Sequence, residues 1–143
     1  MVKSLRSIAA VVGLLAALSA APACADDAKP ATEARAVISR QLDAFARDDA
    51  AGAYELAAPG LKTTFSDPDM FMAMVRGQYA PVYRHRSVEF GDAAVDDDAI
   101  AITLTIVDDD NQVWTALYKL ARQPDGRLLI TGCLLTKSGQ KAT

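Results

Sequence analysis

The spacing of the hydrophobic residues changes near Arg86, and this change constrains the fold of the 143-residue chain more than any other feature. Before Arg86 the apolar residues recur every three to four positions, as they do on one face of a helix. After it they alternate with polar residues, as in strands that bury one face. We therefore expect helices first and a sheet afterwards.

Three amphipathic helices are expected in the first part. The first is predicted from a cap at Thr32 to about Arg47, because its apolar residues share one face: Ala34, Val37, Ile38, Leu42 and Phe45. A shorter second helix is predicted to end at Pro59-Gly60, with a brief extended piece over 61–65. Its apolar residues are Ala53, Tyr54, Leu56 and Ala57.

The third helix has the clearest start signal. In Ser66-Asp67-Pro68-Asp69 an aspartate can cap the free backbone amides, and proline suits the first turn. Its apolar stripe includes Phe71, Met74 and Val75, and Pro81 is expected to end it.

Four strands are expected after the helices, at residues 86–94, 99–107, 112–121 and 127–136. The short links between them predict an antiparallel meander. One face of the second strand holds Ile100, Ile102, Leu104 and Ile106, and we expect the helices to cover it. The same parity adds Val88, Phe90, Trp114, Ala116, Tyr118 and Leu120, whereas the last strand is apolar on both sides and stays unassigned. The predicted fold is α+β, with three N-terminal helices on one face of a curved four-stranded meander.

The N-terminus has the pattern of a cleavable export signal. Lys3 and Arg6 precede an uncharged stretch over 8–18, and Ala23-Cys24-Ala25 offers small residues for cleavage after Ala25. A membrane anchor is the first alternative, but Pro22 interrupts the stretch before the roughly 20 residues that a span needs. The second is lipidation of Cys24, which lacks the usual leucine-like residue three positions earlier.

This interpretation divides the chain into a signal (1–25), a flexible lead (26–32), one domain (33–137) and a short tail (138–143). It also predicts a periplasmic protein with no membrane span after cleavage. The signal carries two of the 15 basic residues and none of the 18 acidic ones, which leaves a net charge of −5. An acidic domain repels phosphate backbones, so we expect no nucleic-acid partner.

Single polar residues give weaker signals. Removal of Cys24 leaves Cys133 without an intrachain partner, and its apolar neighbours favour a buried thiol over a reactive one. His85, between two arginines, is expected at a solvated strand end, with proton transfer or anion binding as alternatives. The aspartate triplets at 96–98 and 108–110 are typical of turns, so we expect no metal site. We also expect no cofactor, since the chain has no phosphate-binding glycine loop.

A cleft between helices and sheet is the expected place for a ligand. Aromatic residues with a polar tip and the single histidine are the candidate binding residues: Tyr79, Tyr83, His85, Trp114 and Tyr118. Ordinary core packing is the alternative for the aromatic ones. The expected ligand is a small apolar or aromatic molecule, and we predict no catalytic residue.

Three sequence segments resemble the bacterial domain of unknown function 4864. They are Ala57-Ala-Pro59 before Phe65, then 71–75 leading to Tyr79-Ala-Pro81-Val-Tyr83, and Ile130-Thr-Gly-Cys-Leu134. The resemblance covers about residues 33–137, although Leu128 stands where the family typically has tryptophan. It implies an exported protein within the nuclear-transport-factor-2-like, ketosteroid-isomerase-like class of cone-shaped folds, and it implies no activity.

Three functions stay open at this point. The first is a non-catalytic module that binds a small ligand or a protein. The second is an enzyme of the isomerase or lyase kind that uses an aspartate or His85 beside a tyrosine. The third is a structural domain that forms a homodimer through its sheet. Fold analogy alone does not choose among them.

Overall fold

A computed structural model describes residues 25–142 of the chain. The helices are α1 (Ala25–Ala46), α2 (Ala50–Glu55), α3 (Pro59–Thr64), α4 (Pro68–Gln78) and α5 (Ala80–Tyr83). The strands are β1 (Ser87–Asp96), β2 (Ala99–Val107), β3 (Gln112–Arg122) and β4 (Leu128–Lys141). The predicted signal segment lies outside the described residues, except for its last residue, Ala25.

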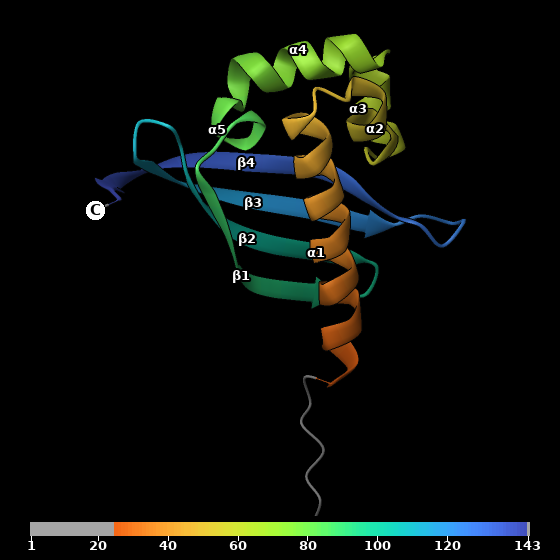
Figure 1. Cartoon of the computed structure of the whole chain (residues 1–143). Coiled ribbons are helices and arrows are strands. Elements are labelled where there is room, and N and C mark those ends of the chain that lie inside the picture. The colour runs from red at the N-terminus through yellow and green to blue at the C-terminus, as the bar shows by residue number, and fades with distance from the viewer. Residues whose placement is uncertain (1–24, 143) are drawn as a thin grey trace, which may run out of the picture.

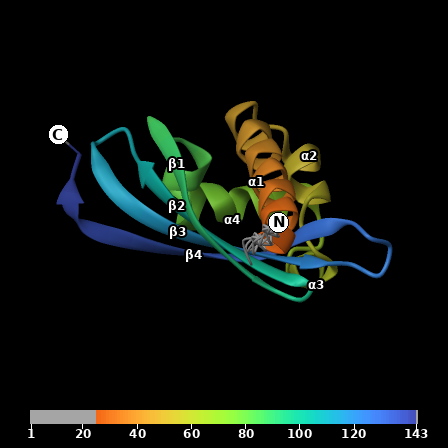
Figure 2. The same ribbon diagram turned by 90° about the horizontal axis from the view of Figure 1, so that it is seen from below.

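The strands form one antiparallel sheet in the order β1-β2-β3-β4, which confirms the predicted meander. The sheet is curved, and the helices lie on its concave side, with α1 crossing the strands (Figures 1 and 2). The fold is therefore α+β, with helices on one face of the sheet.

The predicted parity of β2 is confirmed. Its four isoleucine and leucine side chains at 100, 102, 104 and 106 are buried, and Thr103 and Thr105 alternate with them on the opposite face. On β3 the residues paired with them are also buried at Ala116, Tyr118 and Leu120. Trp114, Val88 and Phe90 are only partly buried, and the last two belong to β1, an edge strand of the sheet.

A bulge in β4 explains why the sequence of this strand shows no clear alternation. Leu120 pairs with Ile130, but Lys119 pairs with Gly132, so Thr131 is an extra residue in β4. Ile130 and Cys133 therefore share the inner face although three positions separate them, since their partners Leu120 and Tyr118 both face the helices.

The prediction of three helices is wrong, since the described residues form five. Both errors occur at prolines that were interpreted as stops. Pro59 begins α3, which includes residues 61–64 of the piece that was expected to be extended. Pro81 lies in the first turn of α5, after α4 has ended at Gln78. A proline suits a first turn because its missing N–H would have no helical partner there.

The Leu56–Ala58 segment separates α2 from α3 because it pairs with the sheet. The Ala58 amide donates to the Ile130 carbonyl at 2.7 Å, and the Ile130 amide donates to the Leu56 carbonyl at 2.9 Å. This parallel bridge covers part of the β4 edge beside the bulge. The start of α4 is as predicted, because the Asp67 carboxylate accepts from the Met70 amide at 2.9 Å.

Two predicted boundaries are wrong at the ends of the domain. Residues 26–32, which were expected to be a flexible lead, are helical, and Thr32 donates its hydroxyl to the Ala28 carbonyl at 2.8 Å instead of capping the helix. The expected tail from residue 138 continues β4 as far as Lys141. The added strand pairs with the start of β3, where Gln112 is opposite Lys141.

Between residues 25 and 142, no helix is long and apolar enough to cross a membrane. The outer face of the sheet carries Leu134, which is 58% exposed. Leu134 pairs with Leu117, which pairs with Thr103. Dimerisation through this face stays a prediction.

Leu104→Ala should lower the free energy of unfolding by about 2–5 kcal/mol, because it leaves a hole in the buried face of β2. Thr105→Ala is the matched control, since the neighbouring residue lies on the exposed face and its loss should cost within about 1 kcal/mol. Urea denaturation of both variants measures the difference. Equal losses would contradict the assignment of the faces.

Candidate ligand-binding site

A cavity of about 340 Å³ lies between the helices and the concave face of the sheet. One side is formed by α4, which packs mainly on α2 and α5 rather than on the strands. The other sides are formed by the C-terminal half of α1 and by the inner face of β3 and β4. Its volume falls within the range of small-molecule sites in proteins.

Most of the lining is apolar. The residues that contribute are Phe45, Leu61, Phe65, Phe71, Met74, Val75, Val82, Ile130 and Gly132. Phe71 is buried, and its ring centroid lies 6.3 Å from that of Phe45 and 6.1 Å from that of Phe65. The first pair is tilted and the second is edge-on, and aromatic pairs favour such arrangements. The exposed side chain of Gln78 also belongs to the lining, which places an opening at the C-terminal end of α4.

A few polar groups from distant parts of the chain meet in this cavity. The Tyr79 hydroxyl donates to the Cys133 carbonyl at 3.0 Å. The Tyr118 hydroxyl donates to Gln41 Oε1 at 3.4 Å, and Gln41 Nε2 donates to the Ala53 carbonyl at 3.3 Å. Tyr118 and Gln41 are 1% and 2% exposed. An apolar pocket with a few fixed polar groups is typical of a site for a small organic molecule.

The titratable groups of this cavity are held in their neutral forms. Burial raises the pKa of the Tyr118 hydroxyl well above its usual value, and the nearby Cys133 and Tyr79 raise it further. Burial also raises the pKa of Tyr79, and it raises the pKa of the Cys133 thiol to about 12. The Cys133 thiol is thus protonated at neutral pH, as expected for an unreactive cysteine, although the residue is only partly buried.

The structure places two of the five candidate binding residues in this cavity, Tyr79 and Tyr118. His85 is partly buried before β1, with Nδ1 at 3.2 Å from the Pro81 carbonyl oxygen. Trp114 donates Nε1–H to Asp108 Oδ2 at 2.8 Å, beneath Lys137. Tyr83 points into a separate polar network. These three residues do not line the cavity.

Several residues of the lining were not predicted from the sequence. The most important are Gln41 on α1 and Cys133 on the inner face of β4. Gln41 had a visible signal, because it is a lone amide on the apolar face of α1 between Ile38 and Phe45. No local sequence pattern indicates that Cys133 faces the cavity, since only the bulge at Thr131 turns it toward Tyr118.

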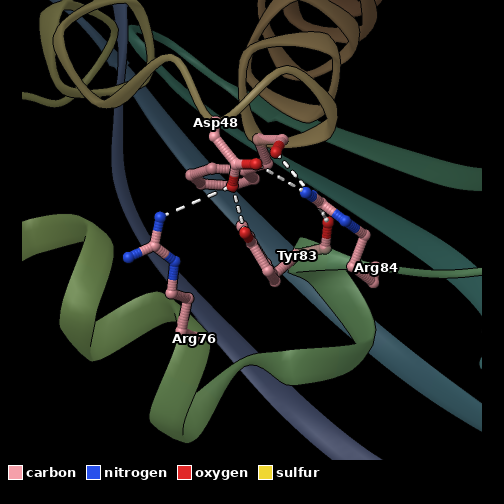
Figure 3. A network of polar contacts seen from close by, with 5 residues as sticks. Asp48, Arg76, Tyr83 and Arg84 are labelled. Atoms are coloured by element: carbon pink, nitrogen blue, oxygen red, sulfur yellow. Dashed lines mark hydrogen bonds and ion pairs between the residues drawn. The ribbon is translucent and has the colours of Figure 1, made fainter.

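Asp48 organises the polar network that fixes α4 and α5 (Figure 3). It follows the end of α1 in the left-handed region, at φ 56°. Its carboxylate accepts from the Tyr83 hydroxyl, from Arg84 Nη2 at 3.0 Å and from Arg76 Nη2 at 3.4 Å. Arg84 also stacks on the Tyr83 ring, 4.0 Å from its centroid, and donates to the Phe45 carbonyl at 2.6 Å. The network therefore ties both helices to the end of α1.

A second hollow, of about 570 Å³, lies along α1 beside α2 and the β3–β4 turn. Its lining mixes both signs of charge, with Arg40, Arg47 and Arg127 among the bases. Glu33 in the same lining is paired with Arg122 through two contacts of 2.7 and 2.8 Å. The opposed charges favour neither an anion nor a cation, so the apolar cavity is the better candidate site.

The described residues contain no group of three histidine, cysteine or acidic side chains that could hold a metal ion. The aspartates at 96–98 lie in and beside the β1–β2 turn, and those at 108–110 precede β3. In the second group, Asp108 accepts from the amides of Asp110 and Gln112, both at 2.9 Å. These carboxylates thus belong to turns.

Asp48→Asn should lower the thermal midpoint near neutral pH, and the difference from the unmutated protein should shrink in acid. The Tyr83 hydrogen bond and the Arg84 guanidinium hold the pKa of Asp48 below its usual value of 3.8. The stability from this carboxylate is thus complete above about pH 3.8 and is lost as the pH falls through the lowered pKa. Calorimetry of both proteins across the acidic range measures it.

Asp109→Asn is the control for this experiment, because Asp109 is an exposed residue of the β2–β3 turn. Its thermal midpoint should follow that of the unmutated protein at every pH. If Asp48→Asn and Asp109→Asn behaved alike, the network would contribute nothing to holding α4 and α5.

Comparison with known proteins gives one match. Neither the curated proteins nor the solved structures include a match to this chain. A protein-family model matches residues 27–143, which is most of the chain and includes every strand and nearly all of α1. The chain therefore belongs to the family described as Domain of unknown function (DUF4864).

Proposed function

We propose that this protein is an exported, non-catalytic binding module for a small, neutral, apolar or aromatic molecule. The cavity between α4, α1 and the sheet is the proposed site. One observation carries the proposal: the cavity of about 340 Å³ has a mostly apolar wall, and polar groups of Gln41, Tyr79 and Tyr118 converge on it. Pockets of this composition orient a ligand by a few hydrogen bonds and hold it by burial.

Binding explains this cavity better than proton transfer does. Its described lining contains no carboxylate and no histidine, and its titratable groups are two tyrosines and a cysteine with raised pKa values. A general acid or base works best with a pKa near the working pH. The isomerase or lyase alternative would need a carboxylate or His85 at the ligand, and the described lining offers neither.

The proposal includes export and a wider fold class. The N-terminal charge pattern and the small residues at 23–25 support cleavage after Ala25 and a periplasmic location. The curved sheet with helices on its concave side supports membership of the nuclear-transport-factor-2-like class of cone-shaped folds. Such a class membership would not identify the ligand.

Export is tested by expressing the full chain in a bacterium and sequencing the N-terminus of the protein released from the periplasm. We expect Asp26 as the first residue, because Ala23 and Ala25 occupy the positions that a signal peptidase recognises. A chain that stays in the cytoplasm with Met1 or Val2 at its start would contradict export.

Met74→Trp should abolish the binding of a naphthalene probe such as 2-methoxynaphthalene. Met74 lines the cavity from α4, and an indole in its place fills much of the space that the probe needs. Equilibrium dialysis with chromatographic measurement of free probe gives the affinity. Circular dichroism shows whether the variant is folded.

Met70→Trp is the matched control for this experiment. Met70 lies one turn earlier on the same helix, is 50% exposed and does not line the cavity. We expect it to bind the probe as the unmutated protein does. Equal binding by both variants would place the probe elsewhere, and failure of the unmutated protein to bind either this probe or 2-naphthol would contradict the proposed site.

A further inference from the structure

We infer that the cavity selects ligands that donate a hydrogen bond, such as alcohols, phenols and N–H compounds, over ligands of similar shape that only accept one. The oxygens of Tyr79 and Tyr118 are the proposed acceptors. This inference rests on the proposed binding function and names the chemical class of its ligand.

The direction of the Tyr118 hydrogen bond is fixed by its neighbours. The Ala53 carbonyl can only accept, so the Gln41 amide turns its Nε2 toward it, at 3.3 Å. Gln41 Oε1 then faces Tyr118 and also can only accept. The Tyr118 proton is therefore directed to Gln41, and the lone pairs of the Tyr118 oxygen remain for another donor.

The direction of the Tyr79 hydrogen bond is fixed in the same way. Its partner at 3.0 Å is the main-chain carbonyl of Cys133, which can only accept. The hydroxyl proton of Tyr79 is thus donated to the main chain of β4, while the hydroxyl oxygen can still accept a hydrogen bond. Tyr79 follows α4 and Tyr118 lies on β3, so two different elements contribute these oxygens to the cavity.

A ligand that only accepts cannot bond to the hydroxyl of either tyrosine without breaking one of these internal bonds. In the part of the chain that the structure describes, every buried side-chain nitrogen and oxygen has at least one hydrogen-bond partner, and Gln41 Nε2 has a second N–H beside the one that it donates to Ala53. A ligand donor adds a bond without breaking one. Gln41 and the exposed Gln78 do not change this preference, because each amide can both donate and accept a further hydrogen bond.

The test compares 2-naphthol with 2-methoxynaphthalene by equilibrium dialysis at neutral pH. The two probes share one ring system, but only the first donates a hydrogen bond. We expect the full-length protein to bind 2-naphthol about tenfold more tightly, as one additional buried hydrogen bond allows. In Tyr79→Phe or Tyr118→Phe, or in the double variant, the ratio of the two affinities should fall toward one.

Tyr54→Phe is the matched control. Its hydroxyl also donates to a carbonyl, that of Phe65 at 2.7 Å, but Tyr54 does not line the cavity, so the tenfold ratio should persist. Equal binding of both probes, or a ratio unchanged in both cavity variants, would overturn the inference and leave the binding function intact. Failure of both probes to bind would overturn the binding function and the inference together.

Discussion

The buried face of β2 and β3 is the constraint on which the rest of the molecule depends. This face holds the buried side chains of Ile102, Leu104 and Tyr118. They lie on one side of the sheet because successive side chains of a strand point to opposite faces. Burial of such side chains contributes about 1.5–3 kcal/mol each. α1 covers this face by crossing the sheet, while α4 packs mainly on other helices. The cavity is the space left between α4 and the strands.

The fold was largely predictable, because apolar residues that alternate with polar ones, in segments joined by short turns, predict an antiparallel meander. The four strands, the buried face of β2 and the Asp67 cap all agree with the sequence pattern. The prolines were the main source of error, since Pro59 and Pro81 suit a helix start as well as a helix end. The course of β4 depends on its pairing with β3, which no local pattern reveals.

The site was less predictable because it joins residues that are far apart in the sequence. Tyr79 and Tyr118 could be proposed from their chemistry and from the expected faces of helix and strand. Tyr83 has the same chemistry, but it turns to Asp48, a partner 35 positions earlier. The role of Gln41 in the site is visible only from its hydrogen bond with Tyr118, which lies 77 positions later in the chain. Such long-range pairings depend on how α1 and α4 are placed over the sheet.

We propose that a neutral molecule binds between α4 and the inner face of β3 and β4. The most direct measurement is nuclear magnetic resonance of the labelled protein with 2-naphthol, recording magnetisation transfer between ligand and protein protons. We expect contacts with Met74, Val75 and Ile130, which line the cavity from both sides. Contacts confined to Leu134 and Thr136 on the other strand face, with none inside, would contradict it.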